Sequence, residues 1–239
     1  MTLDNAALPQ VSVVVPVFNE QDNIAPLVHE ITAALRGVLP FEIIYVDDCS
    51  KDDSREILKQ LRMTVPELRV FGHTRQSGQS TAIRNGVKQA RGEWIATLDG
   101  DGQNDPADIP MLLAQLEQGF DLVSGWRHQR QDNAVSRLLP SKIANRLIAR
   151  VTGVQLHDYG CSLKAYRREL VEDMNLYGEL HRFLPALAFI EGARISEVKV
   201  NHHPRRFGQS KYGLDRTFRV LMDLLTVWFM KRFLTRPMH

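Results

Sequence analysis

Residues 94–106 read WIATLDGDGQNDP, an apolar strand that runs into two aspartates separated by one glycine. Asp99 and Asp101 lie on a turn flanked by glycines, and carboxylate oxygens are hard ligands that suit a divalent cation carrying a diphosphate. The turn therefore predicts a nucleotide-sugar site. An ordinary Asp-Gly turn is the alternative, because these are common turn residues. The preceding strand favours the site, since ligands of open α/β sheets bind beyond the carboxyl ends of strands.

Strands and helices alternate around this segment. The β-branched run at residues 11–15 predicts a buried parallel strand, and apolar residues recur at helical spacing from 24 to 35. The same alternation predicts strands at 41–46, 68–71, 94–98 and 121–124, and helices at 52–61 and 80–90. Repeated β-α units with short connections require a mostly parallel sheet with helices on both faces. The predicted fold is a doubly wound α/β domain.

Length and composition agree with this fold. The chain has 239 residues and is 44% hydrophobic, enough for one large domain with a packed core. No basic-then-apolar leader is recognisable, so we expect no cleaved signal peptide and a cytoplasmic location. Cys49 and Cys161 lack metal-ligand spacing and are expected to be reduced. The adjacent pair His202 and His203 is expected at the surface or behind a site, because no other metal ligand lies at a suitable spacing.

The two halves of the chain differ in charge. Residues 1–120 carry 17 acidic and 10 basic side chains, whereas residues 121–239 carry 11 and 20. An acidic half suits cation binding, and a basic half suits an anionic partner such as phosphate, nucleic acid or a lipid head group. For any single lysine or arginine, a solvated helix surface is the simpler explanation. The second half offers no recognisable nucleic-acid motif, so no nucleic-acid partner is predicted.

Polar residues also follow two earlier strands, as Asn19-Glu20 and Asp47-Asp48. A carboxylate such as that of Asp48 can accept from a base N–H or from ribose hydroxyls. Capping of the helix near residue 52 is the alternative, although Ser50 or Asp52 is better placed for it. The phosphate loops GxxxxGK[ST] and GxGxxG are absent, which disfavours nucleotide kinases and dehydrogenases. A diphosphate here would need a metal ion and arginines.

Taken together, several segments resemble a known family. Residues 14–20 (VVPVFNE), 46–52 (VDDCSKD), 78–86 and 98–106 resemble the nucleotide-binding half of family-2 glycosyltransferases with a GT-A fold. Residues 158–168 (DYGCSLKAYRR) and 205–212 (RRFGQSKY) are similar to the polyprenyl-phosphate branch, which includes dolichyl-phosphate mannose synthases and transferases that load glucose or aminoarabinose onto undecaprenyl phosphate. The aminoarabinose-type enzymes look most similar. The resemblance implies a catalytic domain at 1–212, with a nucleotide and metal half at 1–120 and an acceptor half at 121–212.

The resemblance also implies a set of site residues. The family's Asp-x-Asp-x-Gln metal pattern falls on Asp99, Asp101 and Gln103, which would hold Mg²⁺ or Mn²⁺. The implied catalytic residues are Asp99, Asp101, Arg127, Arg137, Asp158, Arg205 and Lys211. The implied substrate-binding residues are Pro16, Phe18, Glu20, Asp48, Gly78, Asp99, Gly100, Ser141 and Ser210. For Asp158, capping of the turn before Gly160 is an equally good explanation.

Two positions depart from the family pattern. Gly100 stands where alanine is common, and we see no chemical consequence of the missing methyl group. Gln79 stands where many relatives have a lysine that would touch the nucleotide phosphates, which puts that contact in doubt. Arg75 or Arg84 could substitute for it.

The implied reaction needs no side-chain base. A polyprenyl phosphate is already ionised near neutral pH, so its oxygen can attack the anomeric carbon directly. One direct displacement inverts the anomeric centre. The protein then has to position the substrates in line, stabilise the departing diphosphate and hold two anions together, for which arginine forks are suited. The similarity favours a uridine diphosphate sugar as donor, with guanosine diphosphate mannose second.

The tail raises a separate question. Residues 218–233 form a broad apolar surface, but its uninterrupted run, 224–230, is too short to span a bilayer. With Lys231, Arg232 and Arg236 beside it, residues 213–239 predict an interfacial helix at the inner face of the cytoplasmic membrane. The protein would be peripheral, or membrane-anchored if the natural chain continues past His239. Packing of this helix on its own domain, or in a homo-oligomer interface, is the alternative.

Two other functions stay open at this point. The same fold could transfer sugar to a saccharide or other soluble acceptor, although such enzymes have no need of a basic second half or an apolar tail. The chain could also be a nucleotide-binding module without catalytic activity.

Overall fold

The central sheet runs through both halves of the chain. The structure, a computed structural model, describes residues 8–128, 146–172, 174, 176–207 and 214–233. Within these residues one seven-stranded mixed sheet is formed by β1 (Val11–Val17), β2 (Phe41–Asp47), β3 (Leu68–Gly72), β4 (Trp94–Thr97), β5 (Leu122–Arg127), β6 (Lys164–Arg167) and β7 (Ile195–Val200). Because the strand order is β3-β2-β1-β4-β6-β5-β7, the acidic first half and the basic second half meet between β4 and β6.

Most pairings in the sheet are parallel. β1 pairs in parallel with β2 and β4, and β2 pairs in parallel with β3. Helical crossovers make this possible, and they are α1 (Gln21–Leu35), α2 (Ser54–Leu61) and α3 (Gln79–Gln89). β5 and β7 are parallel, whereas β6 runs antiparallel to both β4 and β5. The predicted doubly wound fold is confirmed, with one antiparallel strand that the sequence pattern did not predict.

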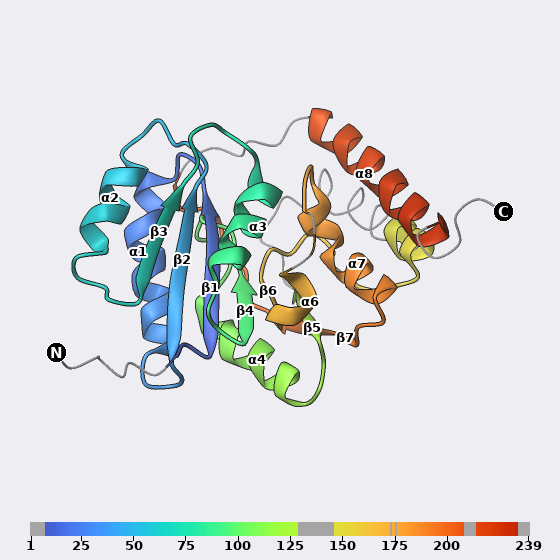
Figure 1. Ribbon diagram of the computed structural model, residues 1–239, viewed down its shortest axis with the longest axis horizontal. Coiled ribbons are helices and arrows are strands. Elements are labelled where there is room, and N and C mark those ends of the chain that lie inside the picture. The colour runs from blue at the N-terminus through green and yellow to red at the C-terminus, as the bar shows by residue number, and fades with distance from the viewer. Residues whose placement is uncertain (1–7, 129–145, 173, 175, 208–213, 234–239) are drawn as a thin grey trace.

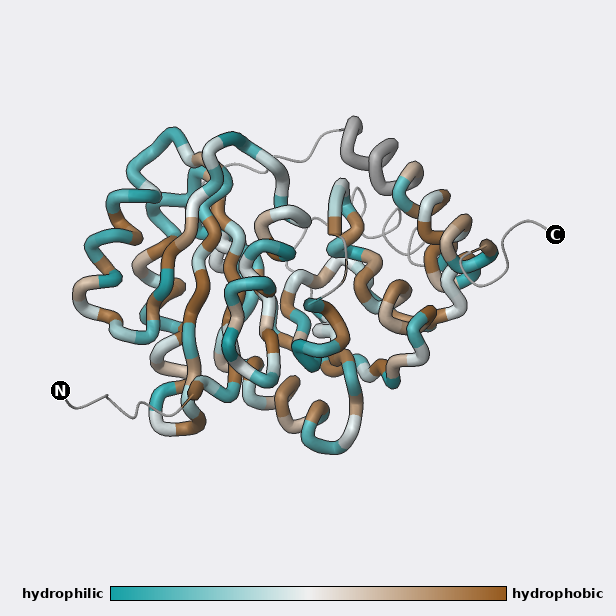
Figure 2. The backbone as a smooth tube through the Cα atoms, in the orientation of Figure 1, coloured by the Kyte–Doolittle hydropathy of each residue, from teal (hydrophilic) through white to brown (hydrophobic). Residues whose placement is uncertain are grey.

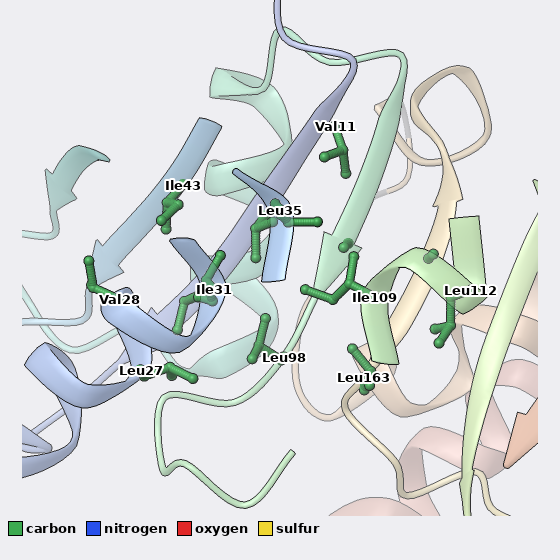
Figure 3. Close-up of a cluster of buried hydrophobic side chains, with 14 of the residues drawn as sticks. Val11, Leu27, Val28, Ile31, Leu35, Ile43, Leu98, Ile109, Leu112 and Leu163 are labelled. Carbon is green, nitrogen blue, oxygen red and sulfur yellow. The ribbon is translucent and has the colours of Figure 1, made fainter. Parts of the chain in front are cut away.

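Helices cover both faces of the sheet (Figure 1). On one face, α1 and α4 (Ile109–Glu117) pack Leu27, Ile31 and Leu112 against the strands, as Figure 3 shows. Val11, Val13 and Val15 belong to this first core, while Val14 belongs to a second core on the opposite face. This alternation is what a strand buried on both sides requires, and it explains the continuous β-branched run.

The second face carries the elements of the chain's second half. α3 packs there with η2 (Leu180–Phe183), α7 (Leu184–Ile190) and α8 (Leu214–Phe233), while α6 (Arg168–Val171) follows β6. The remaining short element is η1 (Pro106–Asp108), directly before α4. η2 thereby brings residues near position 180 against the N-terminal end of α3.

α8 lies on the outside of this face, against α7 and η2 (Figure 1). Leu224 and Val227 of this helix are buried in the second core. This side of α8 therefore packs on its own domain, which was the alternative to an interfacial helix. Among its described side chains, four large apolar ones are exposed: Met222, Leu225, Trp228 and Phe229. Figure 2 shows the hydrophobic stretches along the coloured part of this helix. In the part of the chain that the structure describes, no helix is both long enough and apolar enough to cross a bilayer.

The predicted element boundaries hold to within a few residues. The helix expected from residue 52 begins at Ser54, with Asp53 as its N-cap, and Asp52 Oδ1 accepts the backbone N–H of Ser54 at 3.1 Å in the turn before it. The helix expected within residues 213–239 spans Leu214–Phe233 in the described part of the chain. β6 and β7 were not predicted, since neither segment shows a simple apolar alternation between turn residues.

Candidate active site

The two aspartates follow β4 at the carboxyl edge of the parallel strands, beside the end of β1. The turn between them packs closely on β1. A Cβ built on Gly100 would lie 3.1 Å from the carbonyl oxygen of Pro16, tighter than ordinary contact. Glycine avoids this crowding, so the absent methyl group at position 100 has a structural reason. Pro16 and Gly100, both predicted to bind substrate, are therefore neighbours.

Each aspartate receives hydrogen bonds from the protein. Gln79 Nε2 donates to Asp99 Oδ1 at 2.5 Å, and Arg205 Nη2 donates to Asp101 Oδ2 at 2.5 Å. The backbone N–H of Gln103 donates to Asp101 Oδ1 at 3.1 Å. Burial and the charge of Asp99 raise the pKa of Asp101 to about 6, although Arg205 opposes the shift. Two carboxylates are thus crowded in a site where positive charge is scarce.

This set of residues fits a divalent cation. Asp99 and Asp101 offer carboxylate oxygens and Gln103 an amide oxygen, which are the hard ligands that Mg²⁺ and Mn²⁺ bind. A cation between the carboxylates would relieve the repulsion that raises the pKa of Asp101. Within the described residues, no group of three or more His, Cys, Asp or Glu side chains is arranged to hold a metal ion.

All predicted substrate-binding residues that the structure describes line one cavity. This cavity has a volume of about 960 Å³, measured out to open solvent, and it follows the carboxyl ends of the first strands. Its walls include Pro16, Phe18, Glu20, Asp48, Gly78, Asp99 and Gly100. We call it the donor cavity. Its interior of about 270 Å³ lies just below the range of about 300–1,000 Å³ that is usual for small-molecule sites.

Asp48 organises the loop that enters the donor cavity. Its Oδ1 accepts the backbone N–H of Ser77 at 2.7 Å and lies 2.7 Å from His73 Nδ1, while Oδ2 accepts the backbone N–H of Gly78 at 2.8 Å. Gly78 has a φ of 88°, a value that favours glycine. The buried carboxylate therefore fixes the turn before α3. Its contact with a base or ribose stays a prediction.

A second cavity meets the donor cavity at the aspartates. It encloses about 30 Å³, or about 420 Å³ measured out to open solvent. It shares Gln79, Asp99 and Asp101 with the donor cavity and continues to Arg127. We call it the transfer cavity. Neither Arg75 nor Arg84 lines either cavity, whereas Gln79 lines both. In this structure Gln79 itself reaches the site, and neither Arg75 nor Arg84 takes the place of the lysine that the family resemblance implied at position 79.

Arg127 is held by Asp158. Arg127 Nε donates to Asp158 Oδ2 at 2.7 Å, and Nη2 donates to Oδ1 at 3.0 Å. Burial works to lower the pKa of Arg127, but the hydrogen bond and charge of Asp158 raise it overall, so the guanidinium stays charged. Asp158 Oδ1 also accepts the backbone N–H of Gly160 at 3.1 Å. Asp158 therefore fixes an arginine and also caps the turn.

Arg205 reaches the aspartates because its segment runs along the turn after β4. Asn104 and His202 form an antiparallel bridge, and the backbone N–H of His203 donates to the Gln103 carbonyl at 2.8 Å. These contacts carry Arg205 to Asp101 and, at 3.4 Å, to Glu20 Oε1. The remaining predicted residues, Arg137, Ser141, Ser210 and Lys211, lie outside the described residues.

Sequence reasoning gave no site role to the four basic residues Lys164, His181, Arg182 and His202, which line the transfer cavity. His202, expected at the surface or behind a site, is 8% exposed and lines the cavity wall. Lys164 could have been found, because a lysine between Leu163 and Ala165 is unusual in a strand buried on both faces. His181 and Arg182 come from η2, which carries no recognisable motif.

Comparison with known proteins agrees with this geometry. The sequence profile of glycosyl transferase family 2 matches residues 12–174. The chain belongs to glycosyltransferase family 2. A dodecaprenyl-phosphate galacturonate synthase of Rhizobium johnstonii is 46% identical over 235 residues, which cover 96% of this chain and 70% of the relative. An undecaprenyl-phosphate 4-deoxy-4-formamido-L-arabinose transferase of Pseudomonas savastanoi pv. phaseolicola is 43% identical over 90% of this chain and 64% of its own length.

Solved structures of low identity share the GT-A fold of this family-2 member. Glucosyl-3-phosphoglycerate synthase from Mycobacterium tuberculosis, in complex with Mn²⁺, uridine diphosphate and phosphoglyceric acid, superposes with a TM-score of 0.69 at 18% identity, covering 95% of this chain and 79% of that one. A mannosyltransferase from Pyrobaculum calidifontis, in complex with GDP-Man and Mn²⁺, gives 0.65 at 20% identity, covering 94% and 64%. The predicted family and fold are confirmed.

Proposed function

We propose that this protein transfers a sugar from a nucleoside diphosphate sugar to the phosphate of a polyprenyl phosphate such as undecaprenyl phosphate. The observation that carries the proposal is the meeting of the two cavities at Asp99 and Asp101. A donor held on one side of the aspartates would present its sugar to the cavity on the other side. The names of the two relatives, which are polyprenyl-phosphate sugar synthases or transferases, support the acceptor class.

The donor cavity would hold the nucleotide. Glu20 and Asp48 offer carboxylate oxygens to ribose or base, while Pro16 and Phe18 supply apolar walls. Asp99, Asp101 and Gln103 would hold Mg²⁺ or Mn²⁺, which would neutralise the leaving diphosphate. We favour a uridine diphosphate sugar and place guanosine diphosphate mannose second.

The acceptor phosphate needs positioning and no deprotonation. It is ionised near neutral pH and can attack the anomeric carbon in a single inverting displacement. Arg127, kept charged by Asp158, would orient this phosphate in the transfer cavity. Arg205 would move from Asp101 to a phosphate oxygen once a cation takes over that carboxylate. Arg137, Ser141, Ser210 and Lys211 are proposed to assist at the acceptor side.

The exposed apolar side chains of α8 support action at a membrane surface. Trp228 and Phe229 are exposed, and Lys231 and Arg232 lie in the last turn, a combination that suits the head-group region. We propose a location at the inner face of the cytoplasmic membrane. We also propose the division into a catalytic domain at 1–212 and an interfacial helix at 213–239.

A partition assay tests the function. The purified chain is incubated with Mn²⁺ or Mg²⁺, a radiolabelled UDP-sugar or GDP-mannose, and undecaprenyl phosphate in detergent. We expect label in the butanol phase as a glycosyl phospholipid, and loss of it on chelation. Label that stays in water on a saccharide would support the soluble-acceptor alternative. Donor binding without turnover on any acceptor would instead indicate a nucleotide-binding module.

A further inference from the structure

Four cationic side chains among the described residues line the two cavities, and three of them are paired with carboxylates. Arg127 is bound by Asp158 and Arg205 by Asp101. Arg182 Nε lies 3.2 Å from Glu179 Oε2. The fourth is Lys164, for which no carboxylate of the described residues lies within ion-pair distance of 4.0 Å. Among the cavity-lining cations of the described residues, Lys164 is thus the one without a carboxylate partner.

Lys164 is also the most deeply placed of the four. It lies on β6 in the middle of the sheet, in register with Thr97 of β4 and Ser124 of β5, and is 3% exposed. Its Nζ donates to the carbonyl oxygen of Cys161. Burial lowers the pKa of its ammonium group, and the charges of Cys161, Asp158 and Asp99 oppose this only in part. The charged form is therefore costly in the free protein, and an anionic ligand that reached Nζ would stabilise it.

The place of Lys164 restricts what that ligand can be. It lines the transfer cavity together with Asp99, His181 and Arg182, and it also lines a small pocket between Asp99 and Leu184. The donor cavity meets the transfer cavity at Gln79, Asp99 and Asp101, where the diphosphate would bind. A sugar attached to that diphosphate can therefore turn one of its substituents toward Lys164.

We propose that Lys164 binds a carboxylate on the transferred sugar, so that the donor is a nucleoside diphosphate hexuronic acid. This inference rests on the function proposed above and names the sugar class that the site selects. A carboxylate carries the single negative charge that one ammonium group can match, whereas phosphates are commonly bound by planar arginine forks. A neutral sugar would leave the buried ammonium group without a counter-charge.

Donor binding by the unmodified protein is the first test. Isothermal titration with Mn²⁺ present compares UDP-glucuronate and UDP-galacturonate with UDP-glucose and UDP-galactose. We expect at least one uronate to bind about tenfold or more tightly than its uncharged counterpart. Equal or tighter binding of both uncharged donors would overturn the proposal, and this comparison needs no variant.

The variant Lys164→Met then assigns the preference to this residue. We expect the ratio of kcat/KM for uronate over hexose donor to fall by about 100-fold, because a buried charge pair loses one partner. Lys164→Arg keeps the charge and should retain part of the preference. The matched control Lys199→Met removes a lysine from the surface of β7 and should leave the ratio unchanged. An equal loss with both donors in a folded Lys164→Met protein would contradict the assignment.

The outcome separates this inference from the proposed function. Transfer to lipid phosphate with no uronate preference would retain the function and reject the role of Lys164. A uronate preference in binding, without transfer to any polyprenyl phosphate, would retain the sugar class and reject the acceptor.

Discussion

Arg205 and Asp101 are separated by 104 residues, yet Nη2 of the arginine lies 2.5 Å from Oδ2 of the aspartate. The same guanidinium lies 3.4 Å from Glu20 Oε1, so one cation from the second half of the chain spans the carboxyl ends of β1 and β4. Because Asp101 is also a predicted metal ligand, Arg205 and a divalent cation compete for one carboxylate. Metal binding at the donor site would therefore change the position of Arg205, a residue from the acceptor half of the chain.

Arg205→Met should therefore destabilise the metal-free protein. Loss of the arginine leaves the buried carboxylate of Asp101 without its ion-pair partner, at a cost of about 1–3 kcal/mol. We expect a melting temperature lower by roughly 5 °C in chelator and a partial recovery with Mn²⁺, measured by thermal unfolding. Arg206→Met is the matched control, because its ion pair with Glu30 is exposed and contributes little. Equal losses in the two variants would contradict this account.

The raised pKa of Asp101 predicts how stability depends on pH. The folded protein holds this proton more tightly than the unfolded chain does, since the pKa rises from 3.8 to about 6. The contribution of Asp101 to the free energy of unfolding is therefore highest below about pH 4 and falls as the pH rises to 6. Asp101→Asn removes this loss, so we expect the variant to gain roughly 1–3 kcal/mol relative to the parent between pH 4 and pH 7 in chelator. Urea unfolding at several pH values measures it, with the exposed Asp22→Asn as control.

The same substitution should abolish turnover. Asp101→Asn replaces an anionic oxygen ligand with a neutral amide, so Mn²⁺ binding should weaken and transfer should fall by about 1,000-fold. In the parent protein, Mn²⁺ affinity should decline below about pH 6, where Asp101 becomes protonated. Calorimetric titration of Mn²⁺ checks both. A variant with unchanged affinity and turnover would remove Asp101 from the metal site.

Sequence patterns predicted which residues meet at the donor cavity, because these residues lie at the ends of strands that the β-α alternation makes parallel. Pro16, Asp48 and Asp99 end three parallel strands, so they had to meet at one edge. Lys164 shows where this reasoning stops. It belongs to an antiparallel strand inserted between β4 and β5, and no local pattern says which strands a short segment will separate.

The pairing of Arg127 with Asp158 marks a second limit of sequence reasoning. Both residues were predicted as separate catalytic groups, and nothing in their spacing of 31 residues indicates an ion pair. The pair forms because the turn before β6 passes the end of β5. Distances between such segments follow from the packing of the whole sheet, which spacing along the chain does not encode.

A double-mutant cycle should separate the two roles of this pair. Arg127→Met removes the two-point ion pair with the buried carboxylate of Asp158 and should cost about 3–5 kcal/mol in the free energy of unfolding. The double variant Arg127→Met with Asp158→Asn should recover a large part of this loss, because the carboxylate charge that faced the guanidinium is gone. Transfer activity should stay low in both, since the proposed phosphate contact is absent. Recovery of activity together with stability would show that Arg127 acts only structurally.

Membrane binding through α8 can be tested without touching either cavity. Trp228→Ser with Phe229→Ser removes two exposed aromatic side chains, while the buried contacts of Leu224 and Val227 remain. We expect the partition coefficient for vesicles rich in anionic lipid, measured by sedimentation, to fall by about tenfold or more, because the buried apolar area drives interfacial binding. Stability should change little, since surface substitutions of this kind lie within about 0.5 kcal/mol.

The matched control is Phe189→Ser, which removes an exposed apolar side chain from α7. If both proteins bind vesicles as the parent does, α8 is a packing element of the domain and the lipid substrate approaches from another surface.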